Sequence, residues 1–313
     1  MTSYVHGALA QFQHVAIIYL LIALGFHLAN FLLRSLAWRG VLRAAFPDQS
    51  IRLPRIAGAY TAGVAVNAFM PARAGDLVKI AMVRAGISGS NTPAVASSMA
   101  VLGVLDAVIG LMVMLVLWWR GVLPTVPGVH GAVQHVNSLL HMHGGVLIGG
   151  AIVGVVCGAI VAAVRTTGMR RRFAGFAWKV VEGASILRSP RAYARDVVPF
   201  QLGAWASRVG AMYCLLAAFH MHPSAPIAAA AVTASGMATL VPTPGGVGTQ
   251  QALLVYLMQA TASVGSIVTF SLATQGAMTL VNVTLGTIAM MVMFRTARPL
   301  AALRQGVRLG RNG

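Results

Sequence analysis

Long apolar runs alternate with short basic segments along most of this chain. The runs cover approximately residues 14–33, 93–119, 146–164, 197–219 and 267–294. A helix needs about 20 consecutive apolar residues to cross the hydrocarbon core of a bilayer, so each run predicts a membrane span. The first run is retained as a span in this interpretation, because no basic segment of the kind found in signal peptides precedes it.

Two further apolar stretches are interrupted by proline and glycine. The first break, residues 71–76 (PARAGD), separates the apolar segments 57–70 and 77–83. The second, residues 242–248 (PTPGGVG), lies inside the uncharged stretch 227–261. Irregular backbone at membrane depth is tolerated only where it is packed in protein or lines a polar cavity. Each break therefore predicts a broken or re-entrant helical hairpin.

Composition and charge support a membrane protein. Of 313 residues, 58% are hydrophobic and only 9% are charged, whereas soluble proteins are about 25% charged. The net charge of +18 would suggest nucleic acid in a soluble protein. Here the basic residues collect in segments 34–55, 165–195 and 295–313, between or after the apolar runs. Because cytoplasmic loops retain Lys and Arg, we expect a multi-pass inner (plasma) membrane protein with its N-terminus outside and its C-terminus cytoplasmic, and no nucleic-acid partner.

The order of elements predicts an all-α polytopic fold made of two inverted repeats in a single transmembrane domain, residues 1–313. Repeat 1 covers about 14–119, a linking span 146–164, repeat 2 about 197–294, and a basic tail 295–313. A shift of 173 residues places Pro71 on Pro244 and Gly75 on Gly248. The flanks of the first hairpin are basic and those of the second are not, which is typical of inverted transporter repeats. The alternative is that 227–261 forms two short full spans.

The first break carries the densest charge inside an apolar region. Arg73, Asp76 and Lys79 lie within two helical turns of one another. If a half-helix begins near Gly75, Asp76 lies at its N-terminus, where an anion is favoured, and Lys79 falls on the same face. Arginine donates hydrogen bonds in pairs to phosphate, so these residues predict a lipid-phosphate site. The alternative is an Arg73–Asp76 ion pair that only holds the turn.

Asp106 lies in the middle of the 93–119 run. Ionisable groups inside membranes are expensive and usually functional. We expect it to pair with Arg73 or Lys79, or to couple transport to a proton or cation. A helix–helix hydrogen bond is the alternative.

The second break offers backbone N–H groups without side-chain bulk. Gly245, Gly246 and Gly248 open a segment that returns to apolar sequence, and a glycine turn at a helix start can cradle an anion. Gln250 and Gln251 add neutral donors. The alternative role for the glycines is close helix packing.

No motif for catalysis, a metal or a cofactor is present. His130, His135, His141 and His143 lack metal-ligand spacing, and Cys157 and Cys214 lie inside apolar runs. Five acidic residues and scattered histidines form no catalytic constellation. We therefore expect a protein that is not an enzyme and that holds no metal or cofactor.

Two segments carry a family resemblance. Residues 67–79 (NAFMPARAGDLVK), which begin at Asn67, resemble the "N..PARAGE..R" signature of the lysylphosphatidylglycerol synthase transmembrane, or flippase-like, family. Residues 241–248 resemble its second signature, "P..PGG.G...E". The resemblance covers about residues 10–295 and implies a membrane protein that moves polar lipids between leaflets. The soluble synthase domain of two-domain members has no counterpart here, so synthase activity is not expected.

Three positions depart from the family pattern. Asp76 replaces the usual glutamate, Gln251 stands where an acid is expected, and a Glu-Arg pair falls on Leu102 and Gly103. These departures argue against acid-dependent coupling and suggest a diverged substrate.

The sequence thus predicts translocation of an anionic phospholipid or lipid-linked precursor. In this hypothesis Arg73 and Lys79 bind the phosphate, Asp76 and Asp106 position them, and the glycines of the second break line the opposite wall. The alternative is a non-transporting membrane partner that delivers lipid to a glycosyltransferase or another lipid-modifying enzyme.

Overall fold

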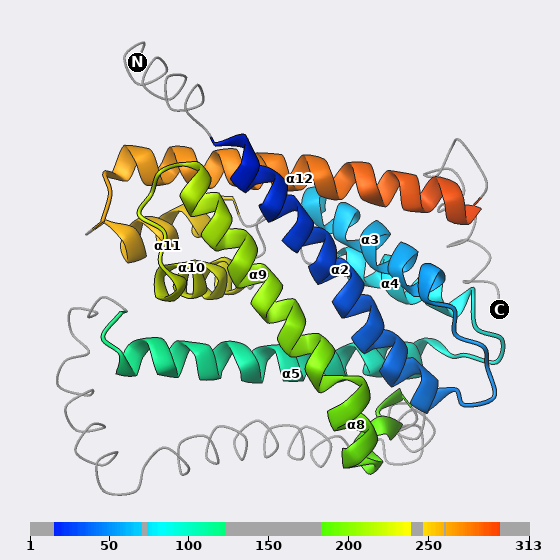
Figure 1. Cartoon of the computed structure of the whole chain (residues 1–313). Helices are drawn as coiled ribbons and strands as arrows, with labels where there is room; N and C mark the ends of the chain where they lie inside the picture. The colour runs from blue at the N-terminus through cyan, green and yellow to red at the C-terminus, as the bar shows by residue number, and fades with distance from the viewer. Residues whose placement is uncertain (1–15, 71–73, 123–182, 239–246, 260, 295–313) are drawn as a thin grey trace, which may run out of the picture. The chain divides into compact units, whose positions relative to one another are not determined.

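The computed structural model describes residues 16–70, 74–122, 183–238, 247–259 and 261–294 (Figure 1). Every regular element in these ranges is helical: α2 (Ile17–Ala45), α3 (Leu53–Phe69), α4 (Ala74–Arg84), α5 (Thr92–Trp119), η1 (Ser185–Arg188), α8 (Pro190–Asp196), α9 (Val198–Ala218), α10 (Ala225–Ala238), α11 (Thr249–Met258) and α12 (Val264–Phe294). The chain divides into two compact units, residues 1–122 with 179–313 and residues 123–178, and all the described residues belong to the first unit. The predicted span 146–164, the histidines of residues 130–143 and the tail 295–313 lie outside the described residues.

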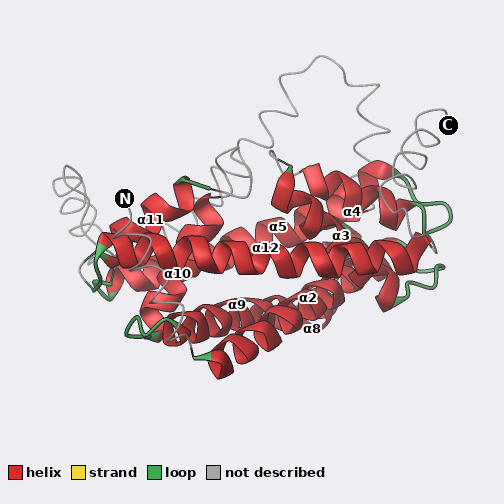
Figure 2. Ribbon diagram, turned by 90° about the horizontal axis from the view of Figure 1, so that it is seen from above, coloured by secondary structure: helices red, strands yellow, loops and turns green. Residues whose placement is uncertain are grey.

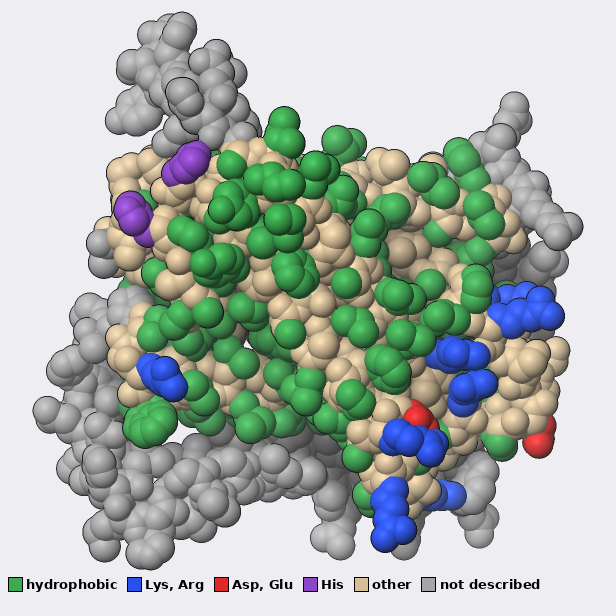
Figure 3. All heavy atoms as spheres, in the orientation of Figure 1, with side chains coloured by type: hydrophobic (Ala, Val, Ile, Leu, Met, Phe, Trp, Pro, Cys, Tyr) green, Lys and Arg blue, Asp and Glu red, His purple; other side chains and the backbone are tan. Residues whose placement is uncertain are grey.

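Three of the described helices are long and apolar enough to cross a membrane, namely α2, α5 and α12. Their outer faces carry large exposed apolar side chains, for example Ile17, Leu280 and Val292. Hydrophobic side chains are spread over the whole described face shown in Figure 3, and most of the Lys and Arg side chains visible there gather at one end. An apolar surface of this extent with charge at its edge is typical of a protein surrounded by lipid.

Helix α2 is longer than the apolar run that predicted it. It continues to Ala45, so Arg34, Arg39 and Arg43 lie on the helix and not in the loop that the sequence predicts. The helix ends just before Pro47, because the residues that precede a proline are disfavoured in the α conformation. This extension of α2 places Arg34 on a helical face that packs against other helices.

Each half of the described chain has the same order of elements. A long helix is followed by a broken pair and a second long helix: α2, α3–α4 and α5 in one half, and α9, α10–α11 and α12 in the other. Helix α3 ends at Phe69 and α4 starts at Ala74, while α10 is described as far as Ala238 and α11 starts at Thr249; residues 71–73 and 239–246 of the predicted breaks lie outside the described residues. The all-helical fold is confirmed within the described residues, whereas the broken or re-entrant hairpins and the inverted relation of the halves stay predictions.

Backbone contact fixes the α3–α4 pair. A Cβ added to Gly75 would overlap the carbonyl oxygen of Gly63, and one added to Gly63 would meet the side chain of Lys79. Small residues let helix backbones approach closely inside a membrane. Glycine at 63 and 75 therefore brings the start of α4 directly against α3.

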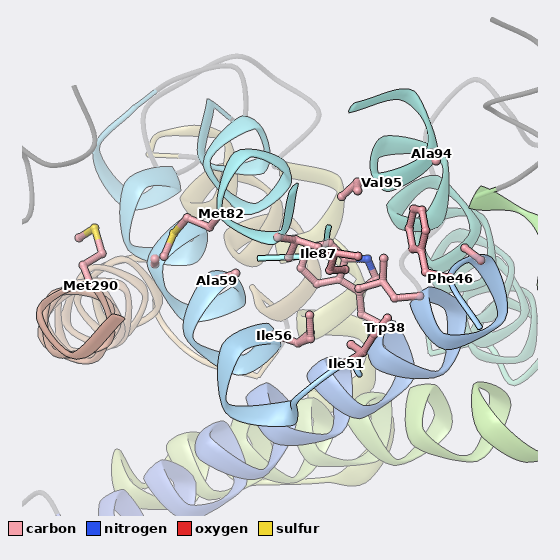
Figure 4. Packing of buried hydrophobic residues seen from close by; sticks show 14 residues of the cluster. Trp38, Phe46, Ile51, Ile56, Ala59, Met82, Ile87, Ala94, Val95 and Met290 are labelled. Carbon is pink, nitrogen blue, oxygen red and sulfur yellow. The ribbon is translucent and has the colours of Figure 1, made fainter. Parts of the chain in front are cut away.

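Helices α2 and α9 lie side by side (Figures 1 and 2), and α3 packs against α12. The largest buried cluster joins α2, α3, α4, α5 and α12; Figure 4 shows Trp38, Ile56 and Ile87 at its centre. The indole of Trp38 donates a hydrogen bond of 2.9 Å to Ser98 Oγ of α5, so the polar atom of this buried side chain is satisfied. These contacts hold α2, α3 and α5 around a set of polar side chains.

Candidate functional site

Asp106 of α5 is the centre of a polar cluster between α2, α5 and α9. Its Oδ1 atom accepts hydrogen bonds from three side chains of α9: Gln201 Nε2 at 3.1 Å, Trp205 Nε1 at 2.7 Å and Arg208 Nη2 at 2.7 Å. Arg34 Nη2 of α2 lies 2.5 Å from the same oxygen. One carboxylate oxygen therefore faces two guanidinium groups, an indole and an amide.

The three donors of α9 share one helical face. Gln201, Trp205 and Arg208 are spaced by four and three residues, which places them on the side of the helix that meets α5. The guanidinium carbon of Arg208 also lies 4.1 Å from the centroid of the Trp205 ring, a distance typical of a cation–π contact. The indole therefore orients Arg208 as well as donating to Asp106.

The pairing of Asp106 differs from the prediction. The sequence predicts Arg73 or Lys79 as its partner, but Arg34 and Arg208 take that place and Lys79 pairs elsewhere. Arg73 lies outside the described residues. Of the alternative roles of Asp106, contact between helices is the one that the structure shows.

The residues around the first break form a second polar group. Helix α4 begins at Ala74, so Asp76 lies in its first turn as predicted. Lys79 Nζ lies 2.8 Å from Asp76 Oδ1, which confirms that the two share a face. Asn67 of α3 accepts a hydrogen bond from Gly75 N at 2.7 Å, and its Nδ2 lies 3.4 Å from Asp76 Oδ1. Asn67 therefore caps the start of α4 across the break.

Tyr60 connects the two polar groups. Its hydroxyl accepts a hydrogen bond of 3.2 Å from Arg34 Nη1, and Lys79 Nζ lies 4.7 Å from the centroid of its ring. The contacts run without interruption from Asp76 through Lys79, Tyr60 and Arg34 to Asp106. Arg208 completes a network that contains three cationic and two carboxylate groups.

This network is largely withdrawn from the surface but is not sealed. Lys79 is 6% exposed, whereas the side chains of Arg34, Arg208 and Asp106 are 21%, 24% and 26% exposed. Within the described part of the chain, the Nε atoms of Arg34 and Arg208 have no hydrogen-bond partner. The two guanidinium groups therefore keep donors for a further acceptor.

The described residues of the second break form hydrogen bonds within the chain and include no charged group. Gly248 has φ +87°, a conformation that glycine adopts without strain. Its N–H donates to Gln251 Oε1 at 2.7 Å, and Gln251 Nε2 donates to Gln275 Oε1 of α12 at 2.7 Å. The N–H of Gly248 is thus used within the chain, and the glutamine at the position of the family acid caps α11. Gln250 is half-buried in the first turn of α11, and Gly245 and Gly246 lie outside the described residues.

The sequence prediction missed Arg34, Arg208, Gln201, Trp205 and Tyr60. Arg208 is the single charged residue of α9, and a lone charge inside an apolar run is a signal for an intramembrane site. Arg34 gave no such signal, because it follows directly on an apolar run, where an arginine usually marks a membrane edge. Within the described ranges, no group of three His, Cys, Asp or Glu side chains is arranged to hold a metal ion.

Comparison with known proteins identifies the family. The profile described as lysylphosphatidylglycerol synthase TM region matches residues 5–286. No curated protein and no solved structure matches the chain. The match confirms the resemblance carried by the two breaks and extends through the helices that hold the charged network. The chain therefore belongs to the family of lysylphosphatidylglycerol synthase transmembrane regions, a family tied to the handling of membrane lipids.

Proposed function

We propose that this protein moves an anionic phospholipid or an anionic lipid-linked precursor between the leaflets of its membrane, without changing it chemically. The observation that carries the proposal is the network of Arg34, Lys79 and Arg208 against Asp76 and Asp106. Three cations face two carboxylates within helices that lie in or beside membrane spans. A net positive charge away from water is costly unless an anion neutralises it.

A phosphate group fits this excess of donors. The four described partners of Asp106 all contact one oxygen, Oδ1. A phosphodiester has two charged oxygens that point in different directions, so it can accept hydrogen bonds from more than one of these donors. Arg34 and Arg208 each retain an Nε donor without a described partner, and guanidinium groups recognise phosphate through paired donors. In this proposal the lipid phosphate binds beside Asp106, and the carboxylate holds the two arginines ready for it.

The first break supplies the second part of the proposed site. Lys79 is linked to Arg34 through Tyr60, and Arg73 precedes Asp76 by three residues in the break. These groups support a path for the phosphate between the break and Asp106. In this proposal Asn67 and Asp76 keep the start of α4 and the Lys79 ammonium group in place.

Translocation of labelled lipid in liposomes tests the proposal. The purified protein is reconstituted with phosphatidylglycerol that carries a fluorophore on an acyl chain, and dithionite added outside bleaches the label of each molecule that reaches the outer leaflet. We expect wild type to move this lipid faster than protein-free liposomes do. Arg208→Gln should lower the rate by about tenfold or more, because it removes a charge-assisted donor pair.

Arg195→Gln is the matched control, since the Arg195 side chain is 79% exposed on α8 and pairs with neighbouring Asp196. It should leave the rate unchanged. A wild-type rate equal to that of empty liposomes refutes transport. A folded Arg208→Gln variant with the wild-type rate refutes this site as the phosphate site.

A further inference from the structure

Gln201 of α9 has a side-chain oxygen that the charged network leaves unused. The residue is 1% exposed, and its Nε2 donates to Asp106 Oδ1 at 3.1 Å, but its Oε1 has no hydrogen-bond partner within the described residues. The orientation of the amide is fixed, because the reverse would turn its oxygen toward a carboxylate oxygen, and neither atom donates. Buried polar atoms in folded proteins are nearly always paired, so this acceptor calls for a donor.

The unpaired oxygen lies close to the two unpaired guanidinium donors. The contacts of Gln201 Nε2, Arg208 Nη2 and Arg34 Nη2 all end on Asp106 Oδ1. The two polar atoms of one amide, like neighbouring nitrogens of one guanidinium group, are about 2.3 Å apart. Gln201 Oε1, Arg208 Nε and Arg34 Nε are therefore each within about 5.5 Å of that single oxygen. One acceptor and two donors thus surround one position.

This position is accessible and carries a net positive charge. The side chains of Arg34, Arg208 and Asp106 are between 21% and 26% exposed. The described titratable groups that surround it or are linked to it by contacts are Arg34 of α2, Tyr60 of α3, Asp76 and Lys79 of α4, Asp106 of α5 and Arg208 of α9. With the carboxylates ionised and Tyr60 neutral, one negative charge on a ligand balances this set.

We propose that the site at Asp106 binds a singly protonated phosphomonoester. Its P–OH group donates to Gln201 Oε1, and its charged oxygens accept from Arg34 Nε and Arg208 Nε. A phosphodiester has the same charge but no proton to donate, so it would leave the buried Gln201 oxygen unpaired. The inference rests on the proposed function and narrows its substrate to lipids whose headgroup is a phosphomonoester.

Two lipids that differ by one methyl group test this specificity. At about pH 6, where a phosphomonoester releases its second proton, a large share of phosphatidic acid carries one charge and one P–OH group. Phosphatidylmethanol has the same charge with a methyl group in place of the proton. We expect wild-type protein in liposomes to move phosphatidic acid about tenfold faster, after subtraction of the protein-free rates, since the methyl ester leaves a buried acceptor unpaired.

Raising the pH gives a second readout of the same contact. At about pH 8 most phosphatidic acid has lost the second proton and no longer carries the donor for Gln201. The ratio of the two rates should therefore fall toward one. The charge of phosphatidylmethanol does not change over this range, so its rate reports any effect of pH on the protein itself.

Two variants of α9 locate the effect. Gln201→Met keeps a side chain of similar length and removes the acceptor, and should bring the ratio at about pH 6 close to one. It also removes the donor to Asp106, a loss that affects both lipids alike. Trp205→Phe is the matched control, because it removes another donor to the same Asp106 oxygen and leaves Gln201 in place. It should slow both lipids and keep the wild-type ratio.

The outcomes separate this inference from the proposed function. Equal wild-type rates for the two lipids, or an unchanged ratio in Gln201→Met, overturn the phosphomonoester site while transport stands. If Gln201→Met does not fold, the wild-type ratio and its pH dependence decide. If neither lipid moves, transport fails, and thermal unfolding in detergent with short-chain forms of the two lipids decides the site. A larger rise of the midpoint with short-chain phosphatidic acid supports it, and equal rises overturn it.

Methyl phosphate, a phosphomonoester without acyl chains, identifies the source of the bound group. At equal concentration it should raise the unfolding midpoint less than short-chain phosphatidic acid does, because it lacks the apolar contacts of a lipid. An equal rise would overturn a lipid as the source and assign the site to a soluble phosphomonoester.

Discussion

Arg208 of α9 and Asp106 of α5 form an ion pair in which Arg208 Nη2 lies 2.7 Å from Asp106 Oδ1, although 102 residues separate them in sequence. Arg34 of α2 shares the same oxygen. Three helices from distant parts of the chain are thus joined at one carboxylate. A substitution at this carboxylate should therefore affect the packing of all three helices.

Asp106→Asn should destabilise the protein strongly. The substitution leaves two guanidinium groups without their counter-charge, and breaking a buried ion pair by removing one partner costs about 3–5 kcal/mol. The measurement is thermal unfolding in detergent. Asp48→Asn, at an exposed position, should leave the midpoint unchanged. Equal midpoints for the two variants would show that Asp106 does not hold α2, α5 and α9 together.

Two substitutions of Tyr60 separate its two contacts. Tyr60→Phe removes the hydroxyl that accepts from Arg34 but keeps the ring beside Lys79, and should cost about 1.5–3 kcal/mol of unfolding free energy, as expected for a hydrogen bond to a charged group. Tyr60→Leu removes the cation–π contact as well and should cost about 0.5–2 kcal/mol more. Denaturant unfolding of both variants checks this order. Equal stability of the two would show that the ring contributes nothing to holding Lys79.

Gly75→Ala should disturb the start of α4. The added methyl group would overlap Gly63 O and crowd Asn67, and overpacking of this kind costs about 1–3 kcal/mol. Gly103→Ala in α5 is the matched control, because a Cβ there meets nothing within 4 Å; it should be neutral or stabilising by up to about 1 kcal/mol. Thermal midpoints that fall in the reverse order would contradict the close contact of α3 and α4.

Gly248→Ala should weaken the start of α11. The residue has φ +87°, and a left-handed conformation costs a residue with a Cβ about 1–2 kcal/mol. Gly265→Ala, at a position with open space and no such φ, is the control. Unfolding midpoints in detergent measure the difference. A Gly248→Ala variant as stable as this control would mean that the turn adopts another conformation.

The positions of the breaks and of the helices beside them are predictable because their signals are local. Proline and glycine interrupt apolar sequence at residues 71–75, and the structure begins α4 at Ala74 with Asp76 in its first turn. The Asp76–Lys79 pair follows from helical spacing alone. The family signature is equally local, since it consists of short motifs at the two breaks.

The centre of the site is not predictable in the same way, because its contacts join residues far apart in sequence. Asp106 in an apolar run indicates the need for a cation, but spacing says nothing about a partner 102 residues away. Arg34 directly follows an apolar run, a position at which arginine usually lies at the membrane edge. Its place among packed helices becomes evident only because α2 continues to Ala45. The lone charge of Arg208 in an apolar run is the one local signal that points to α9.

The contact of Gly63 with Gly75 closes one route by which the proposed lipid substrate could reach Lys79. Backbone lies against backbone there, and no layer of side chains separates α3 from α4 at that level. At this level there is therefore no space between α3 and α4 for an acyl chain. In the proposed function, a lipid whose phosphate reaches Lys79 therefore cannot place an acyl chain between α3 and α4 at the level of Gly63 and Gly75.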